Sequence, residues 1–202
     1  MPSHLPDRPR RVPRQQRGER RVAELLDAAA AVIAKAGYEA ATMSGIAARA
    51  GASIGSLYQF FPNKLSITRA LWNRYADQFE DVWAPLERDA GTLSLERLSG
   101  RLIDSTVRFA ENHPAFLALF DAPASARSPV EVRNVFRRRL AGFFIAGHPR
   151  MSKPKALRLA TVVLEIVKAL NRLYPEIHPT QRSKYVREFK MVLLSYLSAR
   201  HT

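Results

Sequence analysis

The chain of 202 residues contains no cysteine. This absence excludes disulfide bonds, cysteine nucleophiles and thiolate metal sites, and it is typical of a cytoplasmic protein. No run of about 18 uninterrupted apolar residues occurs, so we expect no transmembrane span. The first residues are basic but have no apolar centre, so we do not expect them to act as a secretory signal.

Signatures of common catalytic sites are also missing. The five histidines do not have the spacing of metal ligands. The sequence has neither a glycine loop that would hold phosphates nor the strand-to-helix motif that presents a nucleophilic serine. We therefore expect no enzymatic activity, no cofactor and no bound metal.

What the chain has in excess is positive charge. Lysine and arginine total 32 against 18 acidic residues, which gives a net charge of +14. This balance favours a polyanionic partner, either nucleic acid or an anionic membrane surface, although a generally arginine-rich composition also explains it. Residues 1–17 are rich in arginine and proline and predict a disordered basic arm. The arm either lies on DNA phosphates or in a minor groove, or it is a solvated tail.

The remaining chain has the pattern of an all-α protein. Apolar residues from Val22 to Ala36 recur on one face of a helix, and Gly37 follows as a left-handed C-cap. After Pro62 no strand-like alternation occurs. Further helices are predicted near 64–87, 93–111, 114–121, 129–146, 155–174 and 181–199.

The most specific pattern begins at Thr42 and reads TMSGIAARAGASIGSLYQFFPNK. Thr42 is a suitable N-cap for one short helix and Ser53 for a second. Gly51, between them, can take the left-handed conformation that a tight reversal needs. Leu57 and Phe61 are four residues apart and are expected to face inward. This layout predicts a helix-turn-helix whose second helix enters the major groove of DNA.

The outward-facing residues of this motif have groups that suit DNA. The hydroxyls of Ser53 and Tyr58 can donate to phosphates, and Gln59 can pair with adenine. Gly55 lets DNA approach closely because it has no side chain. As alternatives, Tyr58 packs against the first helix and Lys64 is a plain surface residue. The predicted DNA-contacting residues are Thr42, Ser53, Ile54, Gly55, Ser56, Tyr58, Gln59 and Lys64.

The string AGASIGSLYQFFPNK resembles the DNA-binding signature of the TetR family of bacterial transcription regulators. The resemblance implies an N-terminal three-helix helix-turn-helix domain over 18–66 and a larger helical effector-binding and dimerisation domain over 67–202. It also implies that Thr42, Ser53, Tyr58 and Lys64 contact the DNA backbone. Ile54 and Gln59 are less usual at their positions, so the operator sequence stays open.

The helix predicted at 155–174 has one narrow polar stripe, and the rest of its circumference is apolar. Such a helix is buried on more than one side, which fits a core on one side and a partner subunit on the other. The last predicted helix, at 181–199, has an equally broad apolar surface. The alternative to a dimer interface is that these helices lie in the centre of a monomer's core. The predicted dimer interface comprises Leu159, Val163, Ile166, Leu170, Phe189, Val192, Leu193 and Tyr196.

Aromatic residues are frequent in the middle helices, where a pocket for a small apolar or amphipathic molecule is expected. Aromatic residues at helical spacing also fit a plain core, and that alternative stays open. The predicted pocket residues are Phe79, Asp104, Arg108, Phe109, Phe116, Phe143 and Asn171.

These observations predict a homodimeric, cytoplasmic regulator that binds an inverted-repeat operator in double-stranded DNA and has no membrane partner. By resemblance it is a repressor that a small-molecule effector, not identified by the sequence, releases from the operator. One alternative is a constitutive, charge-driven DNA-binding protein without an effector. Another is a ligand carrier or enzyme with a vestigial helix-turn-helix. Activation instead of repression also stays open.

Overall fold

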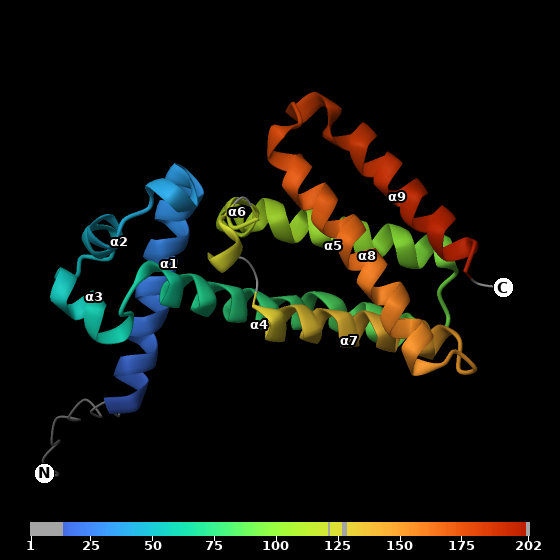
Figure 1. The fold of residues 1–202 in the computed structure, drawn as a ribbon, viewed down its shortest axis with the longest axis horizontal. Coiled ribbons are helices and arrows are strands. Elements are labelled where there is room, and N and C mark those ends of the chain that lie inside the picture. Colours follow the sequence, from blue (N-terminus) through green and yellow to red (C-terminus); the bar gives the residue numbers. More distant parts are fainter. Residues whose placement is uncertain (1–13, 121, 127–128, 201–202) are drawn as a thin grey trace, which may run out of the picture.

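A computed structural model describes residues 14–120, 122–126 and 129–200 (Figure 1). The described residues form helices and contain no strand, which confirms the predicted all-α class. None of the helices in this part of the chain is both long and apolar enough to span a membrane. The elements are α1 (Arg14–Ala40), α2 (Met43–Arg49), α3 (Ile54–Phe60), α4 (Lys64–Asp89), α5 (Leu95–Asn112), α6 (Pro114–Ala118), η1 (Ala124–Ala126), α7 (Val130–Gly147), α8 (Lys153–Leu173), η2 (Tyr174–Glu176), η3 (Pro179–Gln181) and α9 (Arg182–Ser198).

The molecule is elongated, with α1, α2 and α3 at one end and the later helices at the other (Figure 1). At the first end, Leu25, Ile33, Ile46 and Leu57 are fully buried and form the core between the three helices. At the other end, α7 packs along α8, and α5 packs against α9. The short helix α6 packs against α1, so the two ends touch there as well.

Helix α4 belongs to both ends. It begins with a capping box, in which the side chain of Asn63 accepts a 2.8 Å hydrogen bond from the backbone N–H of Ser66. Its first turns bury Ile67 and Leu71, and its later turns bury Phe79 and Trp83. The boundary predicted between 66 and 67 therefore falls inside a continuous helix, and the hydrophobic core runs across it.

Helix α1 begins at Arg14 and is interrupted at Gly37. Gly37 has the positive φ expected of it, 78°, but its ψ of 167° is extended and not that of a left-handed helical cap, and a kink there separates the last residues of α1 from the rest. Positions 14–17 are helical, so the prediction of a disordered arm is wrong for them. The rest of the predicted arm, residues 1–13, lies outside the described residues.

Candidate nucleic-acid interface and ligand cavity

The helices α2 and α3 each begin with a local hydrogen bond to a capping side chain. The hydroxyl oxygen of Thr42 accepts from the backbone N–H of Gly45 at 3.1 Å, and that of Ser53 accepts from Ser56 at 3.1 Å. Each cap satisfies one of the N–H groups that a helix start leaves without a partner. Gly51 has φ of 58° and reverses the chain between the two helices. The predicted caps and the predicted turn are thus confirmed.

Helix α3 has a buried and an exposed side. Leu57 is fully buried and the following Phe61 is nearly so, as the sequence predicted. On the other side Ile54 is 43% exposed and Tyr58 is 50% exposed. A methyl group placed where Gly55 has no side chain would meet nothing within 4 Å. Phe60, which the sequence pattern did not single out, is also exposed, at 37%.

Lys64 has a structural partner that the sequence did not reveal. Its ammonium group donates to the carbonyl oxygens of Tyr38 and Glu39, at 2.8 and 3.1 Å. It also lies 4.3 Å from the centre of the Tyr38 ring. A cation at the C-terminus of a helix stabilises the carbonyl groups left without partners there. Lys64 therefore ties the end of α1 to the start of α4.

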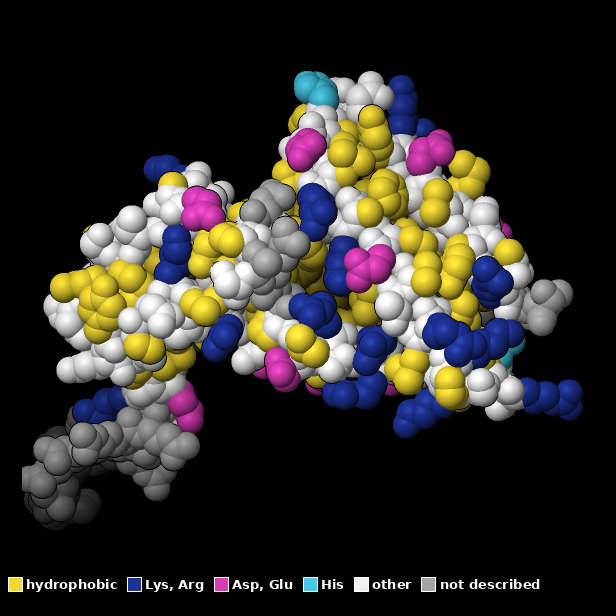
Figure 2. Space-filling view, in the orientation of Figure 1, with side chains coloured by type: hydrophobic (Ala, Val, Ile, Leu, Met, Phe, Trp, Pro, Cys, Tyr) yellow, Lys and Arg dark blue, Asp and Glu magenta, His cyan; other side chains and the backbone are white. Residues whose placement is uncertain are grey.

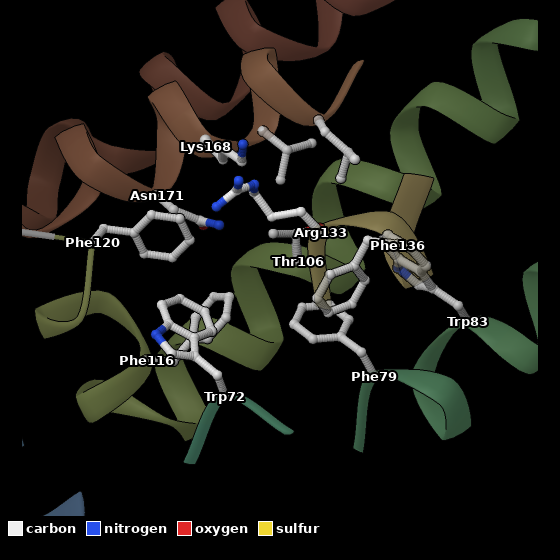
Figure 3. A pocket seen from close by; sticks show the side chains of 12 residues that line it. Trp72, Phe79, Trp83, Thr106, Phe116, Phe120, Arg133, Phe136, Lys168 and Asn171 are labelled. Carbon is white, nitrogen blue, oxygen red and sulfur yellow. The ribbon is translucent and has the colours of Figure 1, made fainter. Parts of the chain in front are cut away.

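A cavity lies among the middle helices (Figure 3). Its empty space is about 500 Å³, including the part open to solvent. Most of its wall is aromatic, and the rings meet edge to face, such as Trp72 with Phe116 and Phe120 at 5.6 Å between centres. The lining residues are Trp72, Phe79, Trp83, Thr106, Phe116, Phe120, Arg133, Phe136, Leu164, Val167, Lys168 and Asn171.

Polar side chains occupy one side of this cavity. Figure 3 shows the nitrogen-bearing ends of Arg133, Lys168 and Asn171 close together, across from the rings of Phe79 and Phe116. Arg133 and Lys168 also line an adjoining groove, together with Glu165 and Arg172. The arrangement combines an apolar space with a cationic edge.

Two protein-family models match the chain. Residues 25–71 match the model described as bacterial regulatory proteins, tetR family. Residues 94–197 match the tetracyclin repressor-like C-terminal domain, so the two matches account for both ends of the molecule. The chain belongs to the TetR family.

Several members of the TetR family and structures with its fold are similar to this chain. The transcriptional repressor KstR of Rhodococcus jostii is 32% identical over 112 residues, which cover 53% of this chain and 51% of KstR. KstR of Mycobacterium tuberculosis is 30% identical over 129 residues, 58% of this chain and 57% of that protein. This chain thus spans about half the length of the curated relatives it matches.

Solved structures of the TetR family share the fold over most of the chain. A TetR-family regulator from Streptomyces coelicolor superposes with a TM-score of 0.71 at 23% identity, covering 89% of this chain and 98% of that one. FadR from Bacillus subtilis, determined in complex with stearoyl-CoA, superposes with a TM-score of 0.67 at 16% identity, covering 86% and 97%.

Three of the residues predicted for a ligand pocket, Phe79, Phe116 and Asn171, line the cavity of this TetR-family chain. Four others do not line it. Phe109 packs against Phe79, with 3.9 Å between the ring centres, and does not reach the cavity. Phe143 is fully buried and packs against Trp83.

The two charged residues predicted for the pocket lie elsewhere. Asp104 forms an ion pair with Lys190 of α9 at 2.6 Å, and Arg108 is exposed on α5. The cations that do line the cavity come from α7 and α8, which the sequence could not place beside α4.

The predicted dimer interface needs a similar correction. Leu159, Val163, Leu170 and Leu193 are buried in the protomer's own core, so they cannot form a docking surface. Ile166, Phe189 and Tyr196 are half-buried, and Val192 is 51% exposed, which is compatible with an interface. Exposed apolar residues that the prediction missed are Val162, Tyr185 and Met191. Hydrophobic side chains gather over α8 and α9 on the face shown in Figure 2.

Proposed function

We propose that this TetR-family chain is a homodimeric transcriptional repressor that binds an inverted-repeat operator through α3 and leaves it when a small molecule occupies the cavity. One observation carries the proposal: the capped helix α3 buries Leu57 and exposes Ile54 and Tyr58 at the end of the molecule, while the cavity lies at the other end. The matched KstR proteins are named transcriptional repressors, which supports repression. We propose no catalytic role, and we place the protein in the cytoplasm.

The proposed DNA contacts follow from exposure and chemistry. The hydroxyls of Thr42, Ser53 and Tyr58 donate to phosphates, which sets the position of the motif on the duplex. Gln59 and Ile54 face the bases, since an amide can pair with adenine and an apolar side chain can contact the methyl group of thymine. Gly55 and Ser56 lie on the same short helix, and their small size allows the DNA to approach α3 closely. Lys64 contributes by holding α1 against α4.

The proposed effector acts through two helices that touch both ends of the molecule. Phe116 of α6 and Trp72 of α4 line the cavity, α6 packs against α1, and α4 starts inside the helix-turn-helix core. A ligand that binds one arrangement of α4 and α6 more tightly shifts the protein toward that arrangement. The cavity, together with the complex of FadR with stearoyl-CoA, supports a small-molecule effector.

The proposed dimer uses the exposed faces of α8 and α9, including Val162, Tyr185, Phe189 and Val192. A two-fold dimer places its two recognition helices in successive major grooves, about 34–36 Å apart. Both half-sites are then bound together, and a change in separation weakens both contacts at once.

The test is a selection of binding sites from genomic DNA at physiological salt. The double variant Tyr58→Phe/Gln59→Leu changes two exposed side chains and should leave the fold intact. The control is Lys153→Gln, an exposed residue at the start of α8. We expect the natural chain and the control to recover a common inverted repeat, and the double variant to lose it.

Other outcomes would overturn parts of the proposal. DNA recovered without a shared sequence would indicate a charge-driven DNA-binding protein, whose affinity falls steeply with salt. No recovered DNA would indicate that the helix-turn-helix is vestigial. A single half-site in place of a repeat would contradict the two-fold dimer.

A further inference from the structure

Helix α3 has no charged side chain. The whole segment between Arg49 of α2 and Lys64 of α4 is uncharged, although the chain has a net charge of +14. Lys64 itself is bound to the carbonyl oxygens of Tyr38 and Glu39. An arginine or lysine paired with guanine is the commonest specific contact in the major groove of DNA. Helix α3 has no side chain that can make this contact.

The exposed side of α3 carries an amide between apolar side chains. At about 100° per residue, Gln59 and Gly55 lie across the helix from the buried Leu57. Ile54, on one side of Gln59, is 43% exposed, and Phe60, on the other side, is 37% exposed. Figure 2 shows hydrophobic side chains gathered at this end of the molecule. The surface that α3 presents is therefore mainly apolar, with one amide at its centre.

These groups match the atoms that A·T pairs present in the major groove. The amide of a glutamine forms two hydrogen bonds with N6 and N7 of adenine, and an apolar side chain contacts the C5-methyl group of thymine. Neither guanine nor cytosine carries that methyl group. From Ile54 to Phe60 the helix axis rises about 9 Å, which corresponds to about three base-pair steps of roughly 3.4 Å.

We propose that α3 reads A·T base pairs, with Gln59 on adenine and with Ile54 and Phe60 on the methyl groups of thymine. The centre of each half-site is then a run of about three A·T pairs, and α3 makes no charged contact with guanine. This inference rests on the proposed function, because it names the class of DNA sequence that the recognition helix binds. It also makes Phe60 a specificity-determining residue.

A selection from random duplex DNA with the full chain is the first test. We expect an inverted repeat with A·T pairs at the centre of each half-site. The selection is repeated with Gln59→Ala, whose side chain is exposed in the natural chain. This variant should lose the preference for adenine at one position of the half-site and keep the preference for thymine at its neighbours.

Uracil in place of thymine then tests the methyl contacts one at a time. Uracil still pairs with adenine but lacks the C5-methyl group, which lies in the major groove, so contacts in the minor groove keep their partners. Each thymine at the centre of the recovered half-site is replaced in turn. We expect about a fourfold loss of affinity at each thymine that α3 contacts, from the transfer free energy of one methyl group.

Variants assign each methyl group to a side chain. In Ile54→Ala one of the uracil replacements should no longer change the affinity, and in Phe60→Ala another should have no effect. The matched control is Val130→Ala, an apolar residue of α7 that is 54% exposed, and it should keep the full loss at every position. Urea unfolding of each variant identifies any loss of binding that comes from misfolding.

The possible results separate this inference from the proposed function. An inverted repeat with G·C pairs at its half-site centres, or uracil duplexes bound as tightly as thymine duplexes, would overturn the inference and leave the proposed regulator intact. An A·T centre that none of the three α3 variants alters would also overturn it, because the preference would then come from the shape of the DNA. Recovery of no DNA, or of DNA without a shared sequence, would contradict the proposed function itself.

Discussion

The ammonium group of Lys64 donates a 2.8 Å hydrogen bond to the carbonyl oxygen of Tyr38, which lies 26 positions earlier in the chain. Tyr38 directly follows Gly37, where a backbone with positive φ interrupts α1. The contact fixes the last residues of α1 onto the first turn of α4. In the TetR signature a lysine at this position implies a DNA backbone contact, but here the same group holds two helices together.

We expect Lys64→Met to lower the free energy of unfolding by about 1–2 kcal/mol, because two carbonyl groups lose a charged donor. DNA affinity should fall while the dependence of log affinity on log salt concentration stays unchanged. Urea unfolding and binding measured at several salt concentrations test both statements. If the slope decreases by about 1, the ammonium is a phosphate contact instead. Tyr58→Phe is the control, and it should leave urea unfolding unchanged.

Two glycines of the helix-turn-helix should respond in opposite ways to alanine. Gly51→Ala forces a side chain into the left-handed region, where φ is 58°, and should cost about 1 kcal/mol of stability. Gly55→Ala adds a methyl group to a helix in open space and should stabilise α3 by about 0.5 kcal/mol. We expect Gly55→Ala nevertheless to weaken operator binding, since its methyl group faces the DNA. Equal stability of the two variants, measured by urea unfolding, would contradict this account.

Two serines of α5 form a second matched pair. Both are buried, but the hydroxyl of Ser99 has no hydrogen-bond partner among the described residues, whereas Ser105 donates to Leu102 at 3.0 Å. Replacing Ser99 with alanine removes an unsatisfied polar group and raises helix propensity. We expect Ser99→Ala to be more stable than Ser105→Ala by about 1 kcal/mol. Thermal or urea unfolding measures the difference, and the reverse order would mean that Ser99 has a partner in solution.

Alkaline pH should weaken the contact between Tyr174 and Glu111. The phenol donates to the Glu111 carboxylate at 2.5 Å, and burial, followed by this hydrogen bond, raises the pKa of Tyr174 to about 12. The folded state thus favours the protonated phenol. Its contribution to stability is complete below pH 10, the ordinary pKa of tyrosine, and is lost as the pH rises toward 12.

The measurement is the difference in unfolding free energy between the natural chain and Tyr174→Phe. We expect this difference to shrink between pH 9 and pH 11.5, both chosen as experimental conditions around the ordinary pKa of about 10. Burial also raises the pKa of Tyr75 to about 12, but Tyr75 is present in both proteins and its effect cancels. A difference that is constant with pH would show that the phenol is not held in its protonated form.

Sequence reasoning succeeded where the structure is decided locally. Thr42 and Ser53 cap helices through hydrogen bonds that span three residues, and Gly51 needs only its own backbone conformation. Such features can be read from neighbouring residues. Lys64 shows the limit of this approach, because its partner lies far away in the sequence.

The helices from α5 to α9 were predicted well, but the faces that they bury were not. Apolar residues surround most of α8, and periodicity does not say which of them pack against α7. Val163 and Leu170 face the core of the protomer, whereas Val162 lies at the surface. The lining of the cavity also depends on which helix faces pack together, since Arg133 of α7 and Lys168 of α8 lie close only because α7 and α8 pack against each other.

Helix α4 also limits how the protein can be divided. It supplies Ile67 to the core of the helix-turn-helix and Trp72, Phe79 and Trp83 to the cavity, with no loop between them. Under the proposed function, a chimera that joins the DNA-binding end to another sensor must transfer α4 whole, and part of the cavity wall goes with it. Operator choice and ligand choice then depend on one shared helix, so an exchange of sensors should keep α4 and replace segments beyond Asp89.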